Sequence, residues 1–126
     1  MGRIRIAVAE DDDVMRAWLV NALRVGETDV HQATSGAELV ALLAEHGPFD
    51  LLVTDLSLPW MDGLQVIASA RSAGVRTPVL FVTGHDHEGL AGLIARFGDS
   101  LLLRKPVGIA ELRAGAQNLL ARHPHP

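Results

Sequence analysis

Residues 51–55 read LLVTD, a short and almost entirely apolar run that ends in an aspartate. A strand with apolar residues on both faces is typical of a parallel sheet that is covered by helices on both sides. We predict such a buried strand over residues 50–54. Comparable runs are IRIAVA at residues 4–9, PVLFV at 78–82 and LLLR at 101–104, and a more polar strand is predicted over residues 28–33. The sequence therefore predicts five strands.

Helical patterns alternate with these strands. Five helices are predicted, over residues 13–25, from Ser35 as the cap to Gly47-Pro48, over 64–73, over 87–97 and over 110–122. Val14, Ala17, Trp18 and Leu23 are predicted to form the buried stripe of the first helix. Residues 87–97 are a weak helix because Gly89 and Gly92 interrupt it. Strict alternation with short connections predicts a parallel sheet with helices on both faces.

Composition limits the class of protein. A chain of 126 residues with 48% hydrophobic residues is predicted to form one domain, ordered over about residues 4–122 and followed by a short His/Pro tail. A net charge of -4 and scattered arginines argue against nucleic-acid binding. The absence of cysteine excludes disulfides and thiolate zinc sites. No apolar run approaches the ~20 residues of a membrane span, and no signal peptide is visible, so a cytoplasmic location is expected.

Polar residues follow the predicted strands at the same edge of the sheet. Acids at residues 10–13 follow the first strand, Asp55 follows the third, Thr83 follows the fourth, and Lys105, the only lysine of the chain, ends the fifth. Open α/β sheets bind ligands just beyond the carboxyl ends of their strands. Each residue alone is compatible with an ordinary turn, but all of them together predict a functional site.

These motifs are also specific to a family. Glu10-Asp11-Asp12, DLLVTDLSLPWMDG at residues 50–63, Val82-Thr83-Gly84 and Lys105-Pro106 resemble, in order and spacing, the receiver domain of two-component response regulators. The resemblance covers essentially the whole chain and is closest in kind to single-domain, chemotaxis-regulator-like receivers. It implies a flavodoxin-like three-layer α/β/α fold, with a five-stranded parallel sheet of order 2-1-3-4-5 and five helices. It also implies that Asp55 is the phosphoacceptor.

The resemblance implies a Mg²⁺ ion, with Mn²⁺ as a substitute. Its ligands would be Glu10 (largely through water), Asp11, Asp55 and the backbone carbonyl of Ser57. A pairing of Asp11 with Asp12 stays open as an alternative. Mg²⁺ prefers oxygen ligands and offsets the repulsion between a carboxylate nucleophile and a phosphoryl group. Lys105 would add a compact positive charge, and the Thr83 hydroxyl would donate to the phosphoryl group.

The implied partners are a histidine kinase or a histidine phosphotransfer protein as donor. The output would be a downstream protein target, or an output or kinase domain in the same chain. Direct contact with nucleic acid or membrane is not expected, and a homodimer stays open. The chain would be a signalling domain that catalyses only its own phosphorylation and slow dephosphorylation. Two positions depart from the family pattern, because Leu102 and Val107 stand where aromatics are common. Leu102 is either a packing residue or part of an apolar patch around the last strand.

Three other classes of protein fit the sequence less well. A phosphatase with an aspartate nucleophile needs a second acid two residues after Asp55, where Ser57 stands. A flavin carrier needs a hydroxyl- and glycine-rich loop where the acids lie, and a receiver-like scaffold without phosphorylation would not need the full set of acids.

His85 and His87 lack a third ligand for a metal site. Trp60 is expected near the acidic edge. The family and the abrupt turn after the last strand together predict a cis bond at Lys105-Pro106.

Overall fold

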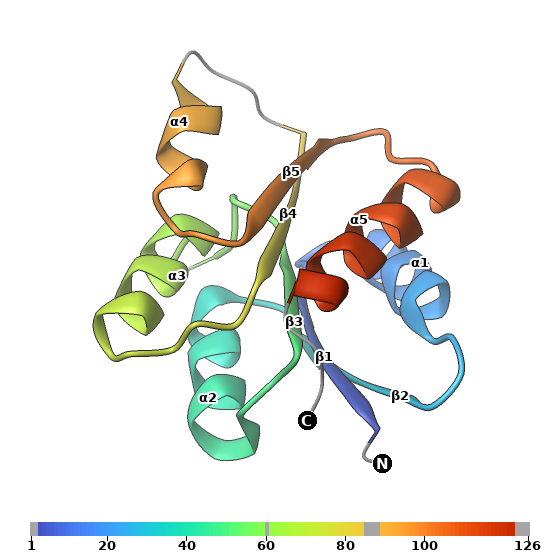
Figure 1. Cartoon of the computed structure of the whole chain (residues 1–126), viewed down its shortest axis with the longest axis horizontal. Helices are drawn as coiled ribbons and strands as arrows, with labels where there is room; N and C mark the ends of the chain where they lie inside the picture. Colours follow the sequence, from blue (N-terminus) through green and yellow to red (C-terminus); the bar gives the residue numbers. More distant parts are fainter. Residues whose placement is uncertain (1–2, 60, 85–88, 123–126) are drawn as a thin grey trace.

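The computed structural model of the chain describes residues 3–59, 61–84 and 89–122. Five strands alternate with five helices along these residues (Figure 1). The strands are β1 (Ile4–Ala9), β2 (Thr28–Ala33), β3 (Leu51–Thr54), β4 (Val79–Thr83) and β5 (Ser100–Arg104). The helices are α1 (Asp13–Leu23), α2 (Gly36–His46), α3 (Gly63–Ser72), α4 (Leu90–Ala95) and α5 (Ile109–Arg122). The predicted alternation is therefore confirmed.

All strand pairs are parallel, and the order in the sheet is β2-β1-β3-β4-β5, as predicted. Helices α1 and α5 cover one face, and α2, α3 and α4 cover the other (Figure 1). Side chains of β3 alternate between the two faces, since Leu51 and Val53 pack with α1 and α5 while Leu52 packs on the opposite side. The run LLVT is apolar throughout because both of its faces are buried.

The predicted stripe of α1 is wrong at its start. Val14 is 80% exposed and Ala17 is exposed, while Leu19, Val20, Ala22 and Leu23 form the buried side of the helix. The first turn of α1 begins at the rim of the sheet, just after β1 ends, and only the later turns cross the strands. Trp18, expected in the core, is partly buried and packs against the cluster on the side of α1 and α5.

The other differences lie at the ends of elements. Thr83 is the last residue of β4 rather than the residue after it, and β5 begins at Ser100, one residue before its predicted start. Its end at Arg104, directly before Lys105, is as predicted. The described part of the fourth helix runs from Leu90 to Ala95 only. The peptide bond between Lys105 and Pro106 is cis, as predicted, and the bond between Gly47 and Pro48 is also cis.

Two further predictions concern Leu102 and a membrane span. Leu102 lies opposite Phe81 in the sheet and is partly buried against the cluster beneath α2, α3 and α4, which agrees with its reading as a packing residue. None of the helices in the described ranges is both long and apolar enough to cross a membrane.

Candidate functional site

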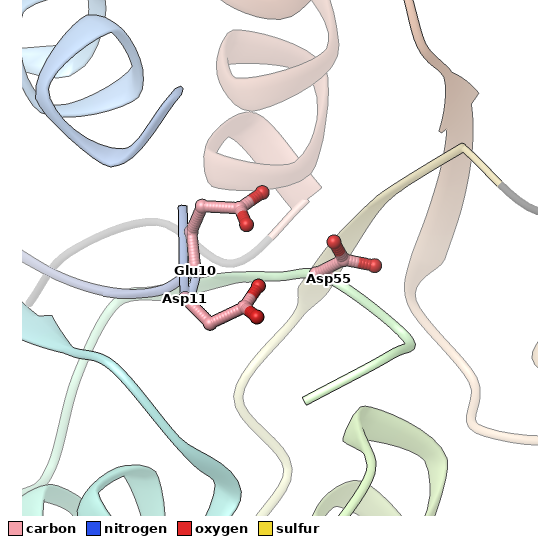
Figure 2. Close-up of side chains that lie close together, drawn as sticks. All are labelled: Glu10, Asp11 and Asp55. Atoms are coloured by element: carbon pink, nitrogen blue, oxygen red, sulfur yellow. The ribbon is translucent and has the colours of Figure 1, made fainter. Parts of the chain in front are cut away.

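The carboxyl ends of β1 and β3 bring three carboxylates together (Figure 2). Backbone hydrogen bonds continue just past the strands: the Glu10 amide donates to the carbonyl of Ala33 at 3.0 Å, and the Asp55 amide donates to the carbonyl of Ala9 at 3.1 Å. Glu10 and Asp55 are therefore held by the sheet itself, while Asp11 follows in the loop. This is the edge at which the sequence predicted a site.

Lys105 connects the two strand ends. Its Nζ donates to Glu10 Oε1 at 2.8 Å and to Asp55 Oδ2 at 2.9 Å. Its backbone amide donates to the carbonyl of Thr83 at 2.8 Å, which holds Lys105 beside the end of β4. The Glu10 side chain is 1% exposed and that of Asp55 8%, against 26% for Lys105. One ammonium group thus serves two buried carboxylates.

The pKa shifts follow from this arrangement. Burial raises the pKa of Glu10, and the hydrogen bond and charge of Lys105 offset that only in part. Burial by itself would lower the pKa of Lys105, but hydrogen bonds to Asp55 and Glu10 and the charges of both outweigh it and raise the pKa. The raised pKa keeps Lys105 positively charged, and burial leaves the Glu10 carboxylate poorly hydrated.

The acids fit a divalent cation. Glu10, Asp11 and Asp55 each offer a carboxylate oxygen, and these oxygens lie within 4.8 Å of one another. An all-oxygen set with excess negative charge is what a hard cation such as Mg²⁺ requires. Among the described residues, this is the cluster of acids and histidines that meets that spacing.

Asp12 has a different role from Glu10 and Asp11. It is the N-cap of α1, and its Oδ2 accepts the backbone amide of Met15 at 2.7 Å. Its own amide donates to Glu10 Oε2 at 3.1 Å. This geometry favours Glu10 with Asp11 over the alternative of Asp11 with Asp12.

Asp55 has one oxygen toward each side of the site. Oδ2 accepts from Lys105, and Oδ1 accepts the backbone amide of Ser57 at 3.0 Å. The contacts from Lys105 and from the Ser57 amide orient the Asp55 carboxylate at the edge of the sheet. Ser57 is exposed, and Thr83 is 1% exposed at the end of the neighbouring strand.

Two glycines let the loop after Asp55 close tightly. A Cβ at Gly63 would collide with the backbone carbonyl of Asp55, and one at Gly36 would collide with that of Met61. The Gly36 amide also lies 3.3 Å from the carbonyl of Pro59 and donates to it. Asp62 caps α3 through a capping box with Gln65. The loop that carries Ser57 is therefore anchored at both ends.

The structure thus gathers Glu10, Asp11, Asp55 and Lys105, with Ser57 and Thr83 on the adjoining loop and strand end. Trp60, His85 and His87 lie outside the described residues. Sequence reasoning missed Arg16, whose side chain donates to the carbonyl of Glu10 at 3.0 Å. The only signal for it was an arginine one helical turn after an acidic run.

Comparisons with known proteins agree with this geometry. The model of the response regulator receiver domain family matches residues 6–117. The transcriptional regulatory protein TrcR of Mycobacterium tuberculosis is 34% identical over 124 residues, which are 97% of this chain and 47% of that protein. The response regulator MprA of Mycobacterium bovis is 37% identical over 121 residues, 94% of this chain and 51% of that protein. The chain spans about half the length of these curated relatives.

Solved structures of receiver domains have the same fold. The signal receiver domain of NarL from Mycobacterium tuberculosis has a TM-score of 0.85 at 28% identity, covering 96% of this chain and 98% of that one. The chemotaxis response regulator CheY4 of Vibrio cholerae has a TM-score of 0.81 at 22% identity, with 93% and 98% covered, and agrees in fold.

Proposed function

Since this chain belongs to the response regulator receiver domain family, we propose that Asp55 accepts a phosphoryl group from a phosphohistidine of a histidine kinase or histidine phosphotransfer protein. The observation that carries this proposal is the pair of contacts from Lys105 Nζ to Glu10 Oε1 and Asp55 Oδ2, 2.8 and 2.9 Å long. They join the end of β5 to the ends of β1 and β3 around one carboxylate.

The proposed reaction is a transfer between two nucleophiles. A carboxylate oxygen of Asp55 forms the bond to phosphorus while the bond from phosphorus to the donor nitrogen breaks, and the imidazole keeps the electron pair. The product is an acyl phosphate, which water later hydrolyses. Because the donor supplies the reactive phosphoryl group, the domain contributes mainly position and charge.

Each site residue has a proposed part in that transfer. The Lys105 ammonium group would leave the Asp55 oxygen and pair with a phosphoryl oxygen, since it is a flexible point charge. The Thr83 hydroxyl would donate to another phosphoryl oxygen, and the Ser57 amide would hold the carboxylate in place. Glu10, Asp11, Asp55 and the Ser57 carbonyl would hold Mg²⁺, with Mn²⁺ as a substitute. That ion, when bound, supplies positive charge against the repulsion between the two anions.

The proposed role is signalling rather than turnover of a free substrate. The position two residues after Asp55 is Ser57, which has no acid to serve a leaving group, so an aspartate-nucleophile phosphatase is less favoured. The domain would catalyse only its own phosphorylation and slow dephosphorylation, in the cytoplasm. An unphosphorylated interaction scaffold is the alternative, and the buried charges of Glu10 and Asp55 speak against it, because a scaffold gains nothing from them.

Output is proposed to occur through protein contacts. The relatives are about twice as long as the matched region, and TrcR is named a transcriptional regulatory protein. The phosphorylated domain would act on a downstream protein or on an output or kinase domain of the same chain, with homodimerisation as a further mode. With a net charge of -4, it is not expected to bind nucleic acid directly.

Intact-mass spectrometry tests the acceptor. The protein is incubated with acetyl phosphate and Mg²⁺, and we expect one added phosphoryl group per chain and none in Asp55→Asn. Asp29→Asn, which changes an acid of β2 paired with Arg3, is the matched control and should label normally. Equal labelling of Asp55→Asn would place the acceptor elsewhere and overturn the proposal.

A further inference from the structure

Arg16 uses all three nitrogens of its guanidinium group to join three segments of the chain. One terminal nitrogen donates to the backbone carbonyl of Glu10 at 3.0 Å, and the other donates to Asp13 Oδ1 at 2.7 Å. Nε donates to the side-chain oxygen of Gln32 at 3.2 Å. Arg16 thereby links the end of β1, the first turn of α1 and the neighbouring strand β2.

The contact with Glu10 matters most because of where that carbonyl lies. It belongs to the peptide that joins Glu10 to Asp11, the two acids at the end of β1. The carboxylate of Glu10 is already held, by Lys105 at one oxygen and by the Asp12 amide at the other. Arg16 adds the third restraint, on the backbone that continues to Asp11.

The other two contacts of Arg16 are weak in comparison. The Asp13 side chain is 86% exposed, and ion pairs in such surroundings contribute little to stability. Gln32 is exposed as well. The Arg16 side chain itself is only 16% exposed, so its bond to Glu10 is the one that is shielded from water.

We propose that Arg16 is a positioning residue that fixes the Glu10–Asp11 peptide and thereby sets both the cation affinity of the site and the rate of Asp55 phosphorylation. The inference rests on the proposed function, because it assumes that Glu10 and Asp11 hold the cation. Arg16 need not touch either the cation or the phosphoryl group.

A positioning role and a mere charge role predict opposite signs. If Arg16 acted only as a positive charge beside the acids, its removal would tighten cation binding. If it positions the peptide, its removal loosens the acids and weakens binding. Residues that support metal ligands in this way typically change affinity or activity by roughly 10–100-fold when replaced.

The experiment measures Mg²⁺ affinity by calorimetry and labelling by acetyl phosphate in Arg16→Lys and Arg16→Gln. Arg16→Lys keeps the charge but loses the planar fork. We expect both variants to bind Mg²⁺ roughly tenfold more weakly or worse and to label more slowly. Arg24→Gln, which removes one exposed positive charge at the other end of α1, and Gln32→Ala, which removes only the Nε partner, should match the unmodified protein.

Amide hydrogen exchange gives a readout that needs no metal. The Asp12 amide, which donates to Glu10, should exchange faster in both Arg16 variants while amides of β3 keep their protection. Unchanged or tighter Mg²⁺ binding in a folded Arg16→Gln would overturn the proposal, as would an Arg16→Lys variant that equals the unmodified protein. Should Arg16→Gln fail to fold, Arg16→Lys decides alone.

Parallel measurements separate this inference from the proposed function. Asp11→Asn should lose Mg²⁺ binding, and Asp55→Asn should lose labelling. If these two behave as expected and the Arg16 variants do not, only the role of Arg16 is wrong. If Asp11→Asn binds Mg²⁺ with unchanged affinity, the assignment of the cation site is wrong, and with it the basis for the role of Arg16.

Discussion

Lys105 Nζ lies 2.8 Å from Glu10 Oε1, and the two residues are 95 positions apart in the chain. The Glu10 side chain is 1% exposed, so its charge depends on this lysine and on the Asp12 amide for compensation. The same ammonium group also reaches Asp55. The ammonium group of Lys105 therefore reduces the charge repulsion between the Glu10 and Asp55 carboxylates at the ends of β1 and β3.

Replacement of Lys105 by Met should separate stability from chemistry. We expect a loss of roughly 1–3 kcal/mol in the metal-free free energy of unfolding, less than for a fully buried pair because Lys105 is 26% exposed. Urea denaturation measures it. Adding Glu10→Gln should recover part of the stability, since one unpaired charge is removed, but not phosphorylation by acetyl phosphate. Recovery of labelling in the double variant would contradict the proposed role of Lys105.

Asp12 should affect helix stability and not the cation. Asp12→Ala removes the cap on the Met15 amide and should cost about 1 kcal/mol, whereas Asp12→Asn keeps a capping oxygen and should cost little. Mg²⁺ affinity, followed by calorimetry, should change far less in Asp12→Asn than in Asp11→Asn. Equal losses in these two variants would favour the alternative pairing of Asp11 with Asp12.

Gly36→Ala should disturb the loop after Asp55. A methyl group there meets the carbonyl of Met61, so the loop or the start of α2 must move, at a cost of about 1–3 kcal/mol. We also expect slower labelling of Asp55, because this loop carries Ser57. Gly92→Ala is the matched control: its Cβ would meet nothing within 4 Å, and thermal denaturation should show no loss. A Gly36→Ala variant that equals Gly92→Ala in both assays would show that the loop adjusts freely.

Stability should fall in mild acid because of His31. Burial lowers its pKa, and the charges of Arg5 and His46 lower it further, while Asp29 opposes them. Its ring also contacts those of His46 and Phe49. The unfolded chain therefore takes up the proton more readily, so the contribution of His31 is complete above the ordinary value of 6.5 and is lost as pH falls through the lowered pKa.

Urea midpoints between pH 7.5 and 5.5 check this prediction. His31→Phe, which keeps a ring against Phe49, should flatten the profile in that range, and His46→Gln should flatten it less. An unchanged slope in His31→Phe would assign the acid sensitivity to other groups.

Several features could be predicted from the chain alone because they depend on short stretches. The apolar run at residues 51–54 predicts a strand buried on both faces, and Ser35 predicts a helix start, since caps act on amides only three residues away. Asp55 and Lys105 could be assigned to one edge because parallel strands all end on the same side. The family followed from the order and spacing of these same motifs.

Tertiary structure decided what depends on contacts between distant residues. Val14 has the pattern of a core residue but is exposed, because the first turn of α1 lies at the rim of the sheet. Glycines 36 and 63 have no room for a side chain because the backbone of the segment from Asp55 to Met61 lies against them. Arg16 reaches Gln32 only once β1 and β2 are paired, which brings the end of β2 beside α1. Local sequence determines which elements form, whereas the way they pack determines which side chains meet.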